Sequence, residues 1–218
     1  MNLTYYARIL LRRGWILVLA MVITAGAAYG FSKGQTPVYR ATQRVLFQPA
    51  RFDFGLTETL RVVLRSFVVF LNTDEQAANA IERLHLDMTP GDLRSHTTIS
   101  SDPSQLIVQI DVDMENGSDA ARIATELGRL LVEYRTEDNQ DLRREDRIDA
   151  VMIDTATVGL YSPKTRINTL AGAILGLLIG GVVAFALEYL ESNIVRDKDD
   201  VERFLELPVL AAIPADEG

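Results

Sequence analysis

The sequence predicts an α+β membrane protein in which two transmembrane helices flank an extracytoplasmic α/β domain with a small sheet and one long helix. Two observations support this fold class. Uncharged runs lie near both ends of the 218-residue chain, at 15–31 and 167–187. The segment between them changes repeatedly from strand-like to helix-like hydrophobic spacing. The chain contains no cysteine, which excludes both a disulfide framework and a thiolate zinc site.

The second uncharged run is the stronger candidate for a membrane span, because a helix of its length rises about 30 Å. It follows Pro163, where we expect the chain to re-enter the membrane. Gly172, Gly176 and Gly180 recur every four residues and therefore form one stripe along the helix. Glycine lets helix backbones approach closely in lipid, so we expect this stripe to pack against another span. A buried helix of a soluble core is the alternative, but each glycine would weaken it by about 1 kcal/mol relative to alanine.

The first uncharged run follows several arginines, which predict a cytoplasmic N-terminus. Gly26 and Gly30 are four residues apart, so we expect a second site of close helix packing. The alternative is a signal peptide cleaved near Ala25-Gly26-Ala27. We favour a span because the apolar run is long for a signal peptide and its small residues continue past that site.

Two spans return the chain to the side on which it began. Both termini are therefore predicted to be cytoplasmic, in a bacterial inner or plasma membrane, with the central domain outside. Membrane lipid is the expected surrounding of the spans. The net charge of −8 argues against nucleic acid as a partner. The predicted segments are the cytoplasmic N-terminus 1–14, the first span 15–32, the extracytoplasmic domain 33–166, the second span 167–188 and the cytoplasmic tail 189–218.

Strands are predicted wherever apolar and polar residues alternate. The clearest is 106–113, and a second begins the domain at 37–48, with Arg40, Thr42 and Arg44 on its polar face. Shorter strands are predicted at 97–100 and 148–154. The sequence thus contains enough strands for one small sheet.

Helices are predicted from apolar spacing of three and four residues and from capping residues. They are expected from residue 55 to 71, from 74 to 84, as a short turn after Thr89, and as one long helix that begins near Gly117. The apolar stripe of the long helix ends near Tyr134. Residues 136–147 are almost all polar, and we interpret them as a continuation of this helix into solvent or along other subunits.

The tail after the second span is too short to bury a core of its own. A short helix is predicted at 199–207 and an apolar, strand-like run at 208–214. We expect its apolar side chains to dock onto a partner, and the candidates are Phe204, Leu205, Leu207 and Leu210.

No spacing of residues predicts catalysis. The chain has no phosphate-binding glycine loop, and its two histidines, His85 and His96, are too far apart for a helical metal pair. Asp111, Asp113 and Glu115 alternate and could hold Ca²⁺, although a solvated strand face explains the same pattern. We predict a protein that is not an enzyme, with no catalytic residue, no bound metal and no cofactor.

The order of these elements resembles the Wzz-type chain-length determinants, or polysaccharide co-polymerases. Residues 37–41 (Pro-Val-Tyr-Arg-Ala) are similar to the first strand of that family, and 117–124 to the start of the helix that follows its central strand. Residues 153–156 with Pro163, and the Asp-Val-Glu and Ile-Pro pairs of the tail, are similar to the segments around the second span. The family commonly has several prolines before that span, whereas this chain has Pro163 alone.

This resemblance implies a homo-oligomer that regulates the chain length and export of a surface polysaccharide, either a capsule, an exopolysaccharide or an O-antigen. The short domain resembles the capsule and exopolysaccharide type without a fused kinase domain. Implied partners are the polysaccharide polymerase or the growing polysaccharide, and a separate cytoplasmic tyrosine kinase that would bind the tail. The alternatives are a two-span membrane sensor whose exterior domain binds a small ligand, and a membrane-anchored enzyme, which the sequence does not support with a catalytic pattern.

Overall fold

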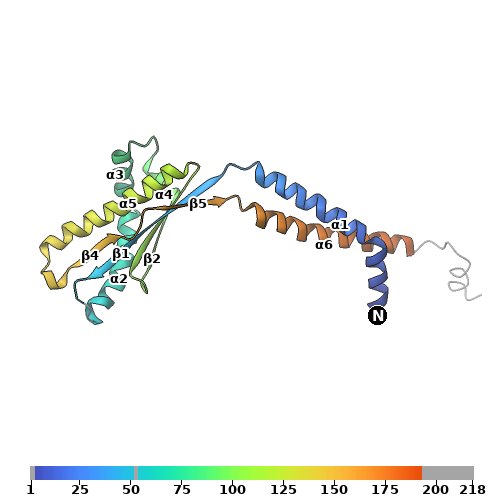
Figure 1. The fold of residues 1–218 in the computed structure, drawn as a ribbon, viewed down its shortest axis with the longest axis horizontal. Helices are drawn as coiled ribbons and strands as arrows, with labels where there is room; N and C mark the ends of the chain where they lie inside the picture. The colour runs from blue at the N-terminus through green and yellow to red at the C-terminus, as the bar shows by residue number, and fades with distance from the viewer. Residues whose placement is uncertain (1–2, 52–53, 193–218) are drawn as a thin grey trace, which may run out of the picture. The chain divides into compact units, whose positions relative to one another are not determined.

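The computed structural model describes residues 3–51 and 54–192, which form two compact units. One unit is built from two long helices, α1 (Leu3–Lys33) and α6 (Thr165–Ser192), which lie side by side (Figure 1). The other unit comprises residues 35–164 and is an α+β domain. The predicted α+β class with two long apolar helices therefore agrees with the structure.

The α+β domain is organised around β1 (Val38–Pro49), the central strand of a five-stranded antiparallel sheet (Figure 1). One edge of β1 pairs with β3 (Ile107–Met114), which in turn pairs with β2 (Thr97–Asp102). The other edge pairs with β5 (Thr157–Ser162) over the first half of β1 and with β4 (Ile148–Met152) over the second half. The first strand of the domain is thus completed by its last two strands.

Helices α2 (Phe54–Leu71) and α5 (Gly117–Asp138) pack against this sheet. Two shorter helices, α3 (Asp74–Leu84) and α4 (Pro90–Ser95), connect α2 to β2. The core consists of alternate side chains of β1 and β3 together with the apolar stripes of the helices. Its largest fully buried apolar side chains are Val45, Phe47, Leu60, Leu64, Leu71, Leu93, Val108, Ile110, Val112, Ile123 and Leu131.

One polar side chain, Gln43, lies on the buried face of β1 and is 1% exposed. Its amide nitrogen donates a hydrogen bond of 2.8 Å to the backbone oxygen of Asp154, in the connection between β4 and β5. Helix α5 passes Gln43 at Gly128, where an added Cβ would lie 3.0 Å from the Gln43 side chain. Glycine at this position lets the long helix approach the sheet closely enough to bury Gln43.

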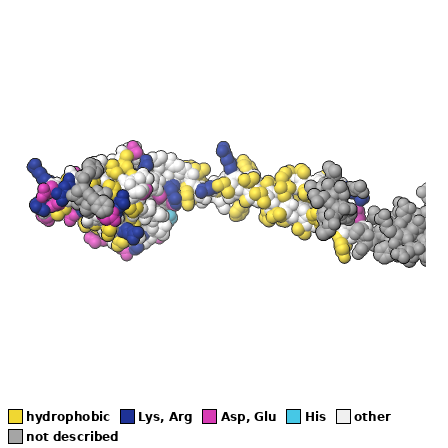
Figure 2. Space-filling view, turned by 90° about the horizontal axis from the view of Figure 1, so that it is seen from below, with side chains coloured by type: hydrophobic (Ala, Val, Ile, Leu, Met, Phe, Trp, Pro, Cys, Tyr) yellow, Lys and Arg dark blue, Asp and Glu magenta, His cyan; other side chains and the backbone are white. Residues whose placement is uncertain are grey.

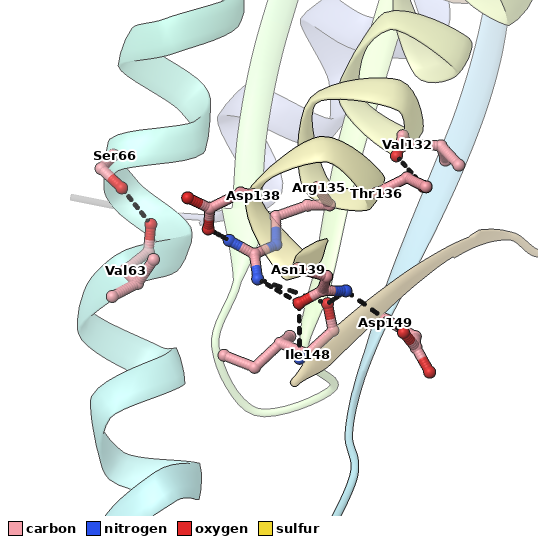
Figure 3. A network of polar contacts seen from close by, with 9 residues as sticks. All are labelled: Val63, Ser66, Val132, Arg135, Thr136, Asp138, Asn139, Ile148 and Asp149. Atoms are coloured by element: carbon pink, nitrogen blue, oxygen red, sulfur yellow. Dashed lines mark hydrogen bonds and ion pairs between the residues drawn. The ribbon is translucent and has the colours of Figure 1, made fainter. Parts of the chain in front are cut away.

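The predicted continuation of the long helix through 136–147 is wrong. Helix α5 ends at Asp138, and 3₁₀ turns follow at Asn139–Asp141 and Arg144–Asp146. The physical reason is Asn139, which is 7% exposed and bonds both backbone groups of Ile148, donating to its oxygen at 2.9 Å and accepting from its nitrogen at 3.1 Å (Figure 3). A residue held to the start of β4 in this way cannot continue a helix into solvent.

Arg135 completes this contact from the last turn of α5 (Figure 3). Its guanidinium donates to Asn139 Oδ1 at 2.9 Å and forms an ion pair with Asp138. The guanidinium also lies 5.6 Å from the centre of the Phe67 ring, a cation–π contact with α2. Arg135 therefore links the end of the long helix both to the start of β4 and to α2.

The sequence analysis also did not predict β5. All but one of its side chains are exposed, so the alternation that predicts a half-buried strand carries little information there. Helix α1 begins at Leu3, well before the predicted span. The predicted tail helix at 199–207 and the run at 208–214 lie outside the described residues.

Candidate functional site

Helices α1 and α6 each contain a stretch that is long and apolar enough to cross a membrane. These stretches are Arg12–Lys33 and Thr165–Glu191. Hydrophobic side chains gather along the visible face of the helix pair in the space-filling view (Figure 2). Many of them are strongly exposed, including Val182 at 70% and Leu178 at 64%, which is costly in water and favourable in lipid.

The glycine stripe of α6 lies against α1 of the same chain. A Cβ added at Gly172 would lie 2.7 Å from the Ala28 Cβ, and one added at Gly176 would overlap the Thr24 hydroxyl. At Gly180 the nearest atom would be the Cα of Leu17, at 2.9 Å. No side chain fits at these three positions without moving α1, because the neighbouring atoms include its backbone.

The glycines of α1 lie differently. A Cβ added at Gly26 or Gly30 would meet nothing within 4 Å, and the same holds for Gly181 of α6. Of the five glycines expected to pack spans together, three therefore pack within the chain and two line an open strip of α1. Packing between chains through Gly26 and Gly30 stays a prediction.

Polar side chains join the two helices at both ends. At the start of the apolar stretch of α1, Arg13 is 12% exposed and lies 2.9 Å from Glu188, with a second ion pair to Glu191. At the other end Ser32 is fully buried and bonds Thr165 at 3.2 Å and Asn168 at 3.1 Å. The helices are therefore antiparallel and are held in register by polar contacts on each side of the glycine stripe.

Pro163 lies in the short segment between the end of β5 and the start of α6. Its predicted role, membrane re-entry, stays a prediction. The kinase-docking candidates Phe204, Leu205, Leu207 and Leu210 lie outside the described residues.

The face of the sheet opposite the core, here termed the open face, carries the polar side chains of β1 and β3. A shallow groove of about 450 Å³ runs over it, here termed the open-face groove. The groove is lined by three of the open-face residues of β1, one of β3 and the whole middle of β5: Arg40, Thr42, Arg44, Gln109, Thr157, Val158, Gly159, Leu160 and Tyr161.

Hydrogen bonds across the strands order the floor of this groove. Arg40 binds Asp113 through two contacts of 2.6 Å, and its guanidinium stacks 3.6 Å from the centre of the Tyr161 ring. The hydrogen bonds that Arg40 donates to the Asp113 carboxylate hold the pKa of the Arg40 guanidinium above its ordinary value. Asp111 accepts hydrogen bonds from the Thr42 hydroxyl at 2.6 Å and from the neighbouring Gln109 amide at 2.9 Å.

These contacts also account for the carboxylates considered as calcium ligands. Asp111 and Asp113 bind side chains of β1 and β3, and Glu115 is exposed after the end of β3. Within residues 3–51 and 54–192, no three His, Asp or Glu side chains are grouped so that they could hold a metal ion. His85 and His96 form the C-caps of α3 and α4, and neither lines the open-face groove.

The polar face of β1 was predicted from the sequence, but the groove was not. Five of its nine lining residues come from β5, which was not predicted, and Tyr161 is brought beside Arg40 by the pairing of residues far apart in the chain. The available signal was the alternation of Val158 and Leu160 with Thr157, Gly159 and Tyr161.

The chain is similar over most of its length to proteins of capsular polysaccharide biosynthesis. It is 24% identical to "Probable capsular polysaccharide biosynthesis protein YwqC" of Bacillus subtilis, over 90% of this chain and 82% of the relative. It is 23% identical to "Capsular polysaccharide biosynthesis protein CpsC" of Streptococcus pneumoniae, over 95% and 91%. "Capsular polysaccharide type 5 biosynthesis protein cap5A" of Staphylococcus aureus is 22% identical, over 82% and 80%.

No protein-family model matches the chain. The relatives nevertheless cover four fifths or more of this chain, so the likeness is not confined to one short segment. The chain is thus a homologue of capsular polysaccharide biosynthesis proteins, and this homology is consistent with its resemblance to the Wzz-type polysaccharide co-polymerases.

Proposed function

We propose that this chain is a non-enzymatic, oligomeric membrane protein that regulates the chain length and export of a surface polysaccharide. The observation that carries the proposal is the combination of two parts. A pair of apolar helices encloses a single α+β domain in the sequence, and 90–95% of the chain aligns with capsular polysaccharide biosynthesis proteins. Capsule synthesis is the common theme of those relatives, and control of chain length is the specific role that we propose.

The contacts within the helix pair support a two-span topology. Because Arg13 lies beside Glu188 and Glu191, the start of the apolar stretch of α1 and the end of α6 lie at the same end of the pair. The arginines of α1 favour the cytoplasmic side of a membrane. We therefore propose that both termini are cytoplasmic and that residues 33–166 lie outside, in an inner or plasma membrane.

Oligomers would form through surfaces that the single chain leaves open. The α6 glycines pack within the chain, whereas the strip of α1 around Gly26 and Gly30 is open and permits close approach of a helix from another copy. A ring of copies would present the same domain surface many times to the growing polysaccharide or its polymerase. Repetition raises the overall affinity of individually weak contacts without any new contact.

The tail provides the proposed link to a separate cytoplasmic tyrosine kinase. Its apolar residues Phe204, Leu205, Leu207 and Leu210 follow the second span in the sequence. Pull-down of a cytoplasmic tyrosine kinase from the same cells tests the proposal. The wild-type tail should retain it, and a tail carrying Phe204→Asp and Leu210→Asp should not; equal retention by both tails would contradict docking.

The proposed function is tested by deleting the gene and measuring the size distribution of the cell-surface polysaccharide by gel filtration. We expect the distribution to change while the sugar composition stays the same. Polymer of unchanged length would contradict the proposal. A reporter fused after Gln105 tests the topology separately, because it should be active only when it lies outside the cytoplasm.

A further inference from the structure

The polar side chains on the floor of the open-face groove are held in place by hydrogen bonds in the absence of any ligand. The side chains of Arg40, Thr42 and Gln109 are each held by a carboxylate of β3, through contacts of 2.6 to 3.1 Å. A ligand therefore meets groups whose rotamers are already fixed, which lowers the entropic cost of binding. The shallow groove follows the strands, a shape that suits a length of polymer better than an enclosed small molecule.

The charges in the groove are balanced. Arg40 is paired with Asp113, and Arg44 lies 3.4 Å from Asp154. A phosphate or carboxylate ligand would have to compete with these carboxylates for the guanidinium groups. An apolar ligand would strip water from several polar groups without replacing their hydrogen bonds. The ligand that fits is uncharged and carries groups that both donate and accept hydrogen bonds.

Gly159 makes room for such a ligand. It lies opposite Arg40 in the register of β1 and β5, and it lines the groove together with Tyr161. A Cβ added at Gly159 would meet nothing within 4 Å, and its backbone does not require glycine because no glycine in the described chain has a positive φ. The absence of a side chain here therefore serves the groove and not the fold, since glycine weakens a strand interior.

We propose that the open-face groove binds an uncharged, hydroxyl-rich segment of the polysaccharide. This inference rests on the proposed function and adds the site and the ligand chemistry. Hydroxyl groups donate and accept, so they can satisfy the guanidinium, amide and threonine side chains of the floor together. The Tyr161 ring, 39% exposed, adds an amphipathic surface at the edge of the groove. A second copy of the chain is the rival occupant, but it would bury these polar groups at a cost unless each found a partner.

The test uses the full chain in lipid nanodiscs. The probe is a set of oligosaccharides released by partial hydrolysis of the polysaccharide exported by the same cells, and binding is measured by calorimetry and by saturation-transfer NMR. Gly159→Ile fills the groove with a side chain that suits a strand. Thr98→Ile is the matched control, because Thr98 is exposed on the open face and does not line the groove.

We expect Gly159→Ile to weaken oligosaccharide binding at least tenfold without lowering the melting temperature, and Thr98→Ile to bind as the wild type does. Equal binding by wild type and Gly159→Ile would overturn the inference, as would absence of binding to the wild type. If Gly159→Ile changes the oligomer mass and leaves oligosaccharide binding intact, the groove contacts a second copy and the inference is wrong. In each of these cases the polymer length in the deletion strain still decides the proposed function independently.

Discussion

At the scale of single residues, Asn139 shows how one side chain can end a helix and begin a strand. Its amide oxygen and nitrogen bond both backbone groups of Ile148, and Arg135 supports it from α5 (Figure 3). Replacing Asn139 by alanine would remove the hydrogen bonds that its side chain makes with the backbone N–H and C=O of Ile148.

We therefore expect Asn139→Ala to lower the free energy of unfolding of the α+β domain by about 1–3 kcal/mol. Denaturant titration of the full chain in nanodiscs, followed by tyrosine circular dichroism, measures this change. Gln140→Ala is the control, since Gln140 is the exposed neighbour. A loss of the same size in both variants would show that Asn139 is not the residue that joins α5 to β4.

The glycine stripe gives a second prediction at this scale. Gly176→Leu should push α6 away from α1, because even a Cβ at this position would overlap Thr24 and would lie 2.7 Å from the Met21 Cα. Gly181→Leu should be tolerated, because a Cβ there meets nothing within 4 Å. The chain has no cysteine, so a pair introduced at Ser32 and Thr165, whose hydroxyls are 3.2 Å apart, reports the helix contact by disulfide formation.

Disulfide formation should slow at least tenfold in Gly176→Leu and stay unchanged in Gly181→Leu. The same rate in both would show that close backbone approach at the stripe does not hold the helices together. Sequence spacing alone identified this stripe, because residues four apart lie on one side of any helix. It could not tell which helix the stripe contacts, since that depends on the rotation of both helices.

At the scale of elements, the short helix α4 depends on its capping box. Thr89 and Asp92 hydrogen-bond each other's backbone N–H groups, and the two side chains also bond directly at 2.7 Å. The hydrogen bond from the Thr89 side chain, followed by that from its backbone N–H, lowers the pKa of Asp92 below its ordinary value. The Thr89-Pro90 sequence was sufficient to predict this turn, because all the groups involved are local.

The sign of the pH dependence follows from that shift. A carboxyl group whose pKa is lowered by folding stabilises the folded state above the unfolded pKa of about 3.9, and this contribution is lost as the pH falls through the folded value. We expect Thr89→Val to raise the pKa of Asp92 toward its ordinary value, as measured by NMR titration of labelled aspartate. Asp102 is an internal control, because Ser104 and Gln105 lower its pKa independently. An unchanged pKa of Asp92 would contradict the capping assignment.

Strand β5 is the element of the sheet that its sequence pattern did not predict. Strands β1 and β3 were predictable because apolar and polar residues alternate along each of them. The side chains of β5 remain largely exposed, so its existence depends on backbone pairing with β1 and not on a hydrophobic pattern. The side of the open-face groove that β5 forms was therefore not predicted from the sequence.

At the scale of the whole molecule, the prediction concerns the charges that join the ends of the helix pair. Arg13→Glu places like charges beside Glu188 and Glu191 and removes one of the arginines that favour the cytoplasmic side. We expect a smaller fraction of chains with both termini in the cytoplasm, measured by protease accessibility of terminal tags in membrane vesicles.

Glu188→Arg added to Arg13→Glu restores an attractive pair with the charges exchanged. The double variant should recover contact between the helices, measured by the same cysteine pair, and recover orientation only in part, because the arginine is still missing from the N-terminal side. Recovery of neither property would show that the ion pair has no part in assembling the two spans.

The position of β1 has a consequence for how the chain acquires its structure. Val38 pairs with Ser162. The first strand of the domain, β1, therefore cannot complete its pairing until the ribosome has synthesised almost the whole domain. During synthesis one edge of that strand has unpaired backbone N–H and C=O groups. Such an edge can pair with strands of other molecules and cause aggregation. A nascent chain stalled before residue 148 would have neither of the strands that close this side, and aggregation of such truncated chains is the vulnerability that this strand order creates.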